Sequence, residues 1–345
     1  DEAEIYSTKA EVVYVEEPED SKIELKTSAG NLAFKEEFVS GELVRTKYAH
    51  NAKDGSFSTV EVMEELLQNS DKKVDKEFLL KIRFFDMLIN DWHRHEEQYL
   101  WVEIERQNGK NILRPFPIDR DNSFLLTDGV IPYLGTRKWG ARKFQNFGPD
   151  ISDMIGMNFV ARHLDRRFLG DMTKDTWQKV AGELKAALTD SVIENSVRQL
   201  PDKLYELRGP FFESILKQRR DKLIEFANRY YDILYKTSII VGTNYPDHYT
   251  IEYNPTGDIR IKSETKVPGK LNLHGDTVIV RPEFTDHIYL YGMDGEDTFE
   301  FNIASKMQVD MHIVGGNLKR FILSTHRARV KLIMRKELKS SHAEI

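Results

Sequence analysis

The chain of 345 residues contains no cysteine. Disulfide bonds, thiolate metal sites and cysteine nucleophiles are therefore excluded. The chain also lacks any run of about 18 apolar residues, the length at which a helix can cross a bilayer, so no transmembrane helix is expected. It opens on the acidic segment DEAEIYSTKAEV rather than on a basic and then apolar stretch, so no secretory signal is expected there.

Neither sign of charge dominates the sequence. Lys and Arg number 50 and Asp and Glu number 56, which gives a net charge of −6. A chain with this balance lacks the basic excess of a dedicated nucleic-acid binder, so no nucleic-acid partner is expected. Apolar residues make up 40% and charged residues 31%, as in ordinary globular proteins.

The period of the apolar residues divides the chain into three segments. Residues 1–48 form a polar, β-rich N-terminal segment, and residues 49–236 have helical periodicity. Residues 237–345 alternate with a period of two between Gly, Asn and Asp turns, which is typical of short strands. We therefore predict an α+β fold with a helical core, a β-hairpin within it and a β-rich C-terminal domain. Within that domain IYLYGMDGEDTFEF and MHIVGGNLKRFIL echo one another, which predicts a small β-solenoid or stacked hairpins.

Two helix starts carry a capping signal. Ser58 and Glu61 match a capping box, and Asp75 precedes a segment whose apolar residues cover most of a helical circumference. Such a helix is typically buried at the centre of a domain. Further helices are predicted at 150–169, 174–187, 190–199 and 210–236.

Residues 84–124 are the most informative stretch. They read FFDMLINDWHRHEEQYLW, a short polar turn, and then ILRPFPIDRDNSF. Residues 98–105 and 111–118 are predicted to form a hairpin around the dipeptide Asn-Gly. The hairpin would bring Asp119 back to the cluster around His93. A base, or a carboxylate that orients the acceptor, next to metal-binding carboxylates is what phosphoryl transfer requires.

The segments NDWHRHEEQYLW and PFPIDRDNSF resemble the kinase-like middle segment of large envelope proteins of Gram-negative bacteria, which carry GDWDRHEDQW followed by RDRDxxF. In those proteins the segment lies between a calcineurin-like phosphoesterase domain and a C-terminal outer-membrane barrel of the assembly-factor type. The resemblance covers roughly residues 35–316 and includes RKWGARKFQNF and MNFVARHLDRRFL. It implies a periplasmic, outer-membrane-associated chain with a periplasmic or outer-membrane protein partner.

More distantly, the segment resembles atypical kinases of the CotH and HipA types. That resemblance implies Mg²⁺ and ATP as cofactors of an active enzyme, and it places the catalytic position at His93. With the residues around it, the site is predicted to comprise catalytic His93 and Asp91, metal-binding Asp119, Asp121 and Gln98, and phosphate- or anion-binding Arg94, His95, Arg137 and Lys138.

The sequence departs from the kinase pattern at two positions. A neutral imidazole at His93 can accept a proton but cannot act as an ionised carboxylate, and the amide of Gln98 is a weaker metal ligand than a carboxylate. No glycine-rich loop followed by a strand lysine precedes residue 48, although Lys26 and Lys35 are possible nucleotide-facing lysines. We interpret the chain as a degenerate kinase-like module that binds or assembles envelope proteins. The alternatives are an active Mg²⁺-dependent phosphotransferase and a non-catalytic part of a larger phosphoesterase.

Other interpretations of the same residues stay open. The cluster around His93 can be ordinary polar residues at a helix end. Asp119 and Asp121 can be turn residues that pair with arginines, for which the sequence offers Arg94, Arg114 and Arg120. His93 and His95 with Asp119 also match a transition-metal site of two histidines and one carboxylate.

Three further groups have a structural and a ligand-binding interpretation. The basic and aromatic residues at 137–144 can bind phosphate or nucleic acid, or pair with acids of the same fold. Arginines at 162, 166 and 167 share a predicted helix with Asp165, which favours salt-bridge packing. The acidic, glycine-containing turn at 292–297 has some likeness to calcium-binding β-roll turns, although an ordinary turn is the favoured interpretation.

Overall fold

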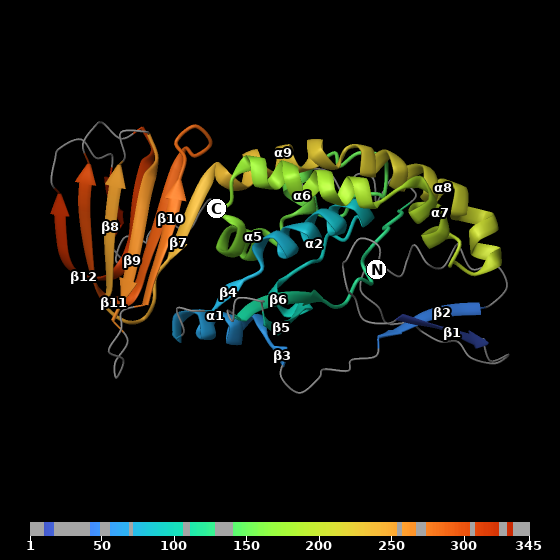
Figure 1. Ribbon diagram of the computed structural model, residues 1–345, viewed down its shortest axis with the longest axis horizontal. Helices are drawn as coiled ribbons and strands as arrows, with labels where there is room; N and C mark the ends of the chain where they lie inside the picture. Colours follow the sequence, from blue (N-terminus) through green and yellow to red (C-terminus); the bar gives the residue numbers. More distant parts are fainter. Residues whose placement is uncertain are drawn as a thin grey trace.

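The computed structural model describes residues 10–16, 42–48, 56–68, 72–105, 111–127, 141–253, 257–266, 274–303, 308–323 and 330–333. These segments form an α+β protein, as predicted, with helices and separate sheets along one elongated molecule (Figure 1). Several residues of the sequence predictions lie outside the described residues, namely Lys26, Lys35, Arg137, Lys138 and Trp139.

The N-terminal segment contributes a two-stranded antiparallel sheet. Strand β1 (Ala10–Glu16) pairs with β2 (Glu42–Tyr48), so that Ala10 lies opposite Tyr48. The strand predicted from AEVVYV is therefore present, whereas the segment KIELKT lies outside the part of the chain that the structure describes.

Both predicted capping signals begin helices. Helix α1 (Thr59–Gln68) starts with a reciprocal box, in which Ser58 N donates to Glu61 Oε2 at 2.7 Å and Glu61 N donates to Ser58 Oγ at 3.3 Å. Helix α2 (Lys76–Ile89) is capped by Asp75, whose carboxylate accepts from Phe78 N at 3.3 Å. Most residues of α2 are buried, so it is the central helix that the sequence predicted.

The predicted hairpin follows α2 after a short 3₁₀ turn, η3 (Glu96–Gln98). Strands β5 (Tyr99–Glu105) and β6 (Asn111–Pro117) are antiparallel, and their register places Tyr99 opposite Pro117. The hairpin is completed into a four-stranded sheet, in the order β3-β5-β6-β4, by β3 (Ser56–Phe57) and β4 (Lys73–Val74).

The helix predicted at 150–169 is wrong, because the chain forms two helices there. These are α4 (Met154–Met157) and α5 (Arg162–Leu169). The cap is Asp153 rather than Asp150, since the Asp153 carboxylate accepts from Gly156 N at 3.0 Å. Asn158 ends α4, and its side chain accepts from the buried Arg83, a tertiary contact that the local sequence does not encode.

The four-helix region that follows differs from prediction in its second half. The helices are α6 (Lys174–Ala187), α7 (Asp190–Val197), α8 (Asp202–Asp221) and α9 (Leu223–Tyr235). The first two match the predicted ranges closely, but a single helix over 210–236 is wrong. Pro210 lies inside α8 instead of at its first turn, and the break falls at Lys222, whose N–H donates to carbonyls of the preceding turn.

The C-terminal segment is a seven-stranded sheet. Its order is β10-β9-β8-β11-β12-β13, with β7 also paired to β11. The strands are β7 (Thr237–Val241), β8 (Asp247–Tyr253), β9 (Ile259–Thr265), β10 (His274–Val280), β11 (His287–Ile303), β12 (Asp310–Leu323) and β13 (Val330–Ile333).

The two echoing segments lie side by side as parallel strands. Register pairs Ile288 of β11 with Met311 of β12, and β13 adds a further parallel strand. Each of these segments forms one continuous strand rather than a hairpin. The first half of β11 pairs with β7 and its second half with β8, both in parallel. The solenoid stays a prediction.

Two separate hydrophobic clusters stabilise the molecule. One joins α2, α6 and α9 around Trp177, and the other fills the β domain around Leu290 and Phe301. The chain changes from helix to strand between Tyr235 and Thr237. Over the ranges given above, no helix is both long and apolar enough to cross a membrane.

Candidate functional site

The site is built where α2 ends. Helix α2 stops at Asn90, which has a left-handed backbone (φ 63°) and turns the chain into the loop that carries His93. The hairpin then leaves and returns, and Ile118 N donates to Gln98 O at 3.0 Å at its base. This bond places Asp119 beside the His93 loop. The predicted convergence of the two clusters is therefore confirmed.

Gln98 connects the two loops. Its Nε2 donates to Asp119 Oδ2 at 3.1 Å and lies 3.4 Å from His93 Nδ1. Its Oε1 is buried and has no hydrogen-bond partner. One neutral amide thus occupies the position between the imidazole and the carboxylate.

A buried ionic network supports the site from below. Asp86 of α2 is its centre, at 2.8 Å from Arg83, 3.2 Å from Arg94 and 2.9 Å from Arg120. Arg83 also donates to Asp165 of α5 at 3.0 Å. The network joins α2, α5 and the segment after the hairpin, so the positions of the two site loops are fixed by the helical core.

Two predicted site residues belong to this network. Arg94 donates to Asp86, to Asp91 Oδ2 at 2.5 Å and to the carbonyl groups of Gln98 and Ile118. Its donors are occupied inside the protein, so the anion-binding prediction for Arg94 is wrong. Asp91 is almost fully buried against Arg94 and accepts from His93 N at 3.4 Å. This placement argues against Asp91 as a catalytic base, because its contacts shape the loop.

Burial and neighbouring charge set the protonation states. Burial alone would raise the pKa of Asp86, but the guanidinium groups of Arg94, Arg120 and Arg83 together hold it below the usual value. Burial lowers the pKa of His93, and the neighbouring His95 and Lys143 lower it further. His93 is therefore a neutral imidazole at pH 7.

Asp119 and Asp121 form a carboxylate pair at the mouth of the site. Partial burial and the neighbouring Asp119 raise the pKa of Asp121 to about 6. Asp119 has a left-handed backbone (φ 56°), a conformation that Asp tolerates better than most residues. Of the arginines that the sequence offered for pairing, Arg114 pairs with Asp75 at 2.8 Å and Arg120 lies 2.9 Å from Asp86.

The arrangement of possible metal ligands favours oxygen over nitrogen. In the ranges that can be described, no group of three or more His, Asp or Glu side chains is placed to hold a metal ion. The predicted set of His93, His95 and Asp119 is thus not formed, and His95 Nδ1 instead accepts from Glu97 N at 3.3 Å. Asp119, Asp121 and the unpartnered Oε1 of Gln98 are hard oxygen ligands of the kind that Mg²⁺ takes.

The acidic turn of the β domain has structural contacts. Asp297 Oδ1 accepts from Asp247 N at 3.1 Å, and a side chain at Gly295 would meet Tyr245 O at 2.0 Å. Close backbone packing between neighbouring coils therefore accounts for the glycine at this turn. Calcium binding there stays a prediction.

The basic and aromatic patch is described only from residue 141 onward. Arg142 pairs with Asp153 at 2.7 Å, and Lys143 lies 4.8 Å from the centre of the Trp92 ring. Pairing within the fold explains Arg142. Lys143 faces a surface depression beside the site, whose other lining residues are His95, Glu96, Glu97, Phe159, Val160, Arg162 and His163.

Sequence reasoning missed the residues that hold the site in place. Arg83 and Asp86 are fully buried charges on α2, three residues apart. Two opposite charges at helical spacing within an otherwise apolar helix were a visible signal. Asn90, with its left-handed backbone, was also readable as a helix end.

Comparisons of this chain with protein-family models, with curated proteins and with solved structures find no match.

Proposed function

We propose that the chain is a degenerate kinase-like module of the bacterial envelope, which acts as a binding or assembly component at the outer membrane. The observation that carries the proposal is the bridge that Gln98 makes between His93 and Asp119. The proposal is supported by the two loops that meet at one site and by the neutral groups, an imidazole and an amide, that His93 and Gln98 bring to it. The envelope context rests on the sequence resemblance.

Two properties of the site disfavour phosphoryl transfer. The acceptor hydroxyl in such a reaction is oriented by an ionised carboxylate, and His93 offers a neutral imidazole in that position. One oxygen of Asp119 is occupied by the amide of Gln98 at 3.1 Å, so a metal ion there would have to displace an existing hydrogen bond. Both features lower the catalytic competence of the site without changing its shape.

The buried network suits a role in binding. Asp86, Arg83 and Arg94 are almost completely inaccessible to solvent, and truncating one member would leave buried charges without partners. The loops above it are thus held in one conformation. A preorganised surface favours association, because little conformational entropy is lost when a partner binds. The neighbouring depression adds an exposed Phe159 and both signs of charge.

An active Mg²⁺-dependent phosphotransferase is the second candidate. It is favoured by the neighbouring carboxylates of Asp119 and Asp121 and by Gln98, which contacts Asp119 and has an unpartnered Oε1. In this alternative Asp119, Asp121 and Gln98 would hold the ion, which supplies charge stabilisation for a transferring phosphoryl group. His93 would accept the proton of the acceptor hydroxyl.

Thermal unfolding with and without Mg²⁺ and ATP separates the two candidates. The degenerate module is expected to show the same midpoint in both conditions, since nothing binds the folded state preferentially. Asp119→Ala serves as the matched control. A rise in midpoint with Mg²⁺ and ATP that is absent in Asp119→Ala would overturn the proposal in favour of the enzyme.

Cross-linking in a Gram-negative envelope fraction tests the binding role. The chain is expected to capture an outer-membrane protein through the surface around Phe159, and Phe159→Asp is expected to abolish the product. Leu207→Asp places the same charge at an equally exposed apolar position on α8 and should leave capture unchanged. Capture that is absent, or equal in both variants, contradicts this role.

A further inference from the structure

A second site candidate lies where the helical core meets the β domain. The ends of α5 and α9 lie next to β7 there (Figure 1). A cavity of about 90 Å³ is lined by these elements and by residues of β8, β9 and β10. Arg166 and Arg167 line it from α5, and Thr237 and Ser238 line it from β7. Ligand cavities are often found at such junctions between structural units.

Neither Arg166 nor Arg167 forms the salt bridge that the sequence predicted. The sequence favoured a salt bridge with Asp165, but the Asp165 carboxylate accepts from Arg83 at 3.0 Å and from Tyr230 at 2.6 Å. Arg166 Nε is buried and has no hydrogen-bond partner. Within the described part of the chain, neither Arg166 nor Arg167 makes an ion pair. Both arginines line the cavity, and Arg166 brings a buried donor without a partner to it.

The other charged residues of the lining already have partners within the protein. Lys76 pairs with Asp171 at 2.6 Å. The carboxylate of Asp247 accepts from Thr243 N at 2.6 Å and from Thr265 Oγ1 at 2.6 Å. Two arginines that make no ion pair within the described residues thus stand against one carboxylate, Asp247, so the lining has a net positive charge that favours an anionic occupant.

The geometry points to a ligand of the phosphate class. We propose that this cavity binds a small tetrahedral oxyanion, either inorganic phosphate or the terminal group of a small phosphomonoester, between Arg166 and Arg167. Guanidinium groups bind such oxyanions through paired N–H donors. The cavity has room for several waters or one ion of this size.

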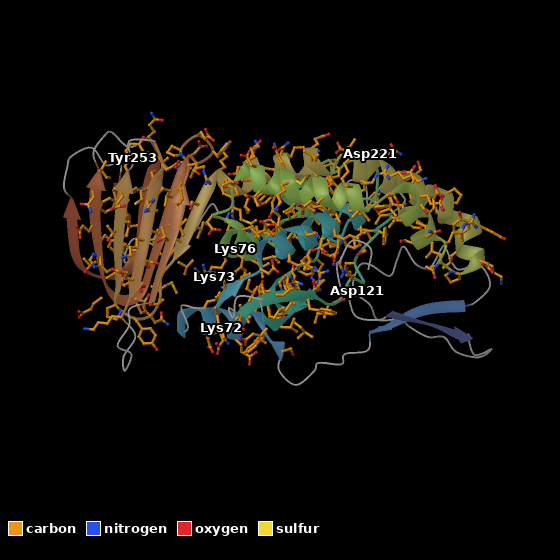
Figure 2. All side chains as sticks on the ribbon, viewed as in Figure 1. Lys72, Lys73, Lys76, Asp121, Asp221 and Tyr253 are labelled. Atoms are coloured by element: carbon orange, nitrogen blue, oxygen red, sulfur yellow. The ribbon has the colours of Figure 1, made fainter. Side chains whose placement is uncertain are left out.

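This site is separate from the His93 site. Lys76, which lines the cavity, and Asp121, which belongs to the first site, lie toward opposite ends of α2 in Figure 2. The inference therefore does not rest on the proposed function. A result on one site leaves the other unaffected.

Calorimetric titration of the full chain tests the proposal, with inorganic phosphate and glycerol phosphate as separate probes and sodium chloride at equal ionic strength as the blank. Binding of phosphate alone would identify the free ion as the ligand, and tighter binding of glycerol phosphate would identify a phosphomonoester. The double variant R166Q/R167Q is expected to lose at least about tenfold in affinity, because both paired donors are removed.

The matched control is R198Q/R260Q, which removes the same charge at exposed positions outside the cavity and should bind as the wild type does. Circular dichroism checks that each variant is folded. If R166Q/R167Q does not fold, R166K/R167K keeps the charge but removes the planar fork, and its affinity should fall several-fold. The proposal is overturned if neither probe binds the wild type, or if the arginine variants bind as tightly as the control.

Discussion

Gln98 and Asp86 show how differently single residues contribute to one site. Gln98 occupies the space between His93 and Asp119, so its amide determines what chemistry is available there. Asp86 lies in the helical core beneath the site, where three arginines contact its carboxylate. Gln98 therefore determines which polar groups the site offers, and Asp86 helps to fix the positions of its loops.

Removing the carboxylate of Asp86 is expected to be strongly destabilising. Asp86→Asn leaves Arg83, Arg94 and Arg120 without their shared counter-ion in a buried position, which typically costs about 3–5 kcal/mol. Urea unfolding followed by circular dichroism measures the change in the free energy of unfolding. Glu206→Gln is the control at an exposed position on α8 and should change it by less than about 0.5 kcal/mol. Equal effects of the two substitutions would contradict the account.

Asp297 is expected to make stability depend on pH. Burial raises its pKa to about 7, and the neighbouring Asp247 carboxylate contributes to the rise. Because the folded state then binds the proton more tightly than the unfolded chain, this contribution is fully present below about pH 4 and is lost as the pH rises through about 7.

Asp297→Asn removes this dependence. Thermal unfolding should give a midpoint about 2–4 °C above that of the wild type at pH 8, where the wild-type carboxylate is ionised, and a smaller difference at pH 5. A difference that is the same at both pH values would show that Asp297 does not titrate in this range.

At the scale of elements, the sequence predicted most helices and strands but misplaced two boundaries. Local signals were sufficient where a cap or a hairpin turn acts alone, as at Asp75 and in the pairing of β5 with β6. They failed at α4 and α8. The break between α4 and α5 depends on the contact of Asn158 with Arg83, and no local rule identifies Pro210 as a helix-interior proline.

The same limit applies to the site and the β domain. The convergence of His93 and Asp119 was predictable, because a hairpin joins them directly. The burial of Arg94 was not, since its partners come from α2 and from the segment after the hairpin. The parallel stacking of β11 on β12 also depends on non-local pairing, which sequence similarity between the two segments left open.

Two glycines in helices are expected to respond in opposite directions to alanine. A side chain at Gly182 in α6 meets nothing within 4 Å, so Gly182→Ala should stabilise the protein by about 0.5–1 kcal/mol through helix propensity. A side chain at Gly156 in α4 would lie 2.3 Å from Arg142 O, so Gly156→Ala should destabilise it by about 1 kcal/mol or more. Chemical denaturation of both variants measures the effects, and the same sign for both would refute this packing.

At the scale of the whole molecule, the two hydrophobic clusters stabilise different parts of the protein. The helical cluster supports the His93 site, while the β cluster holds the C-terminal sheet, which lies next to the ends of α5 and α9 (Figure 1). The arginine-lined cavity lies at their junction. Each cluster has its own large buried side chains, so local losses in one should leave the other folded.

Truncation of a core residue in the β domain tests this division. Phe301→Ala removes a fully buried ring and should destabilise the β strands by about 3–5 kcal/mol. Hydrogen exchange followed by mass spectrometry should then show faster exchange in β8, β11 and β12 and unchanged exchange in α2, α6 and α9. Uniformly faster exchange throughout the chain would mean that the two clusters unfold as one unit.

The central claim is that His93, Gln98 and Asp119 keep the arrangement of a phosphotransferase site without its activity. Transfer of the labelled γ-phosphate of ATP, to water or to the chain itself, measures this most directly. With Mg²⁺ present, we expect the wild type to release or incorporate no more label than Asp119→Asn does. Turnover that requires Mg²⁺ and disappears in both His93→Ala and Asp119→Asn would contradict the account.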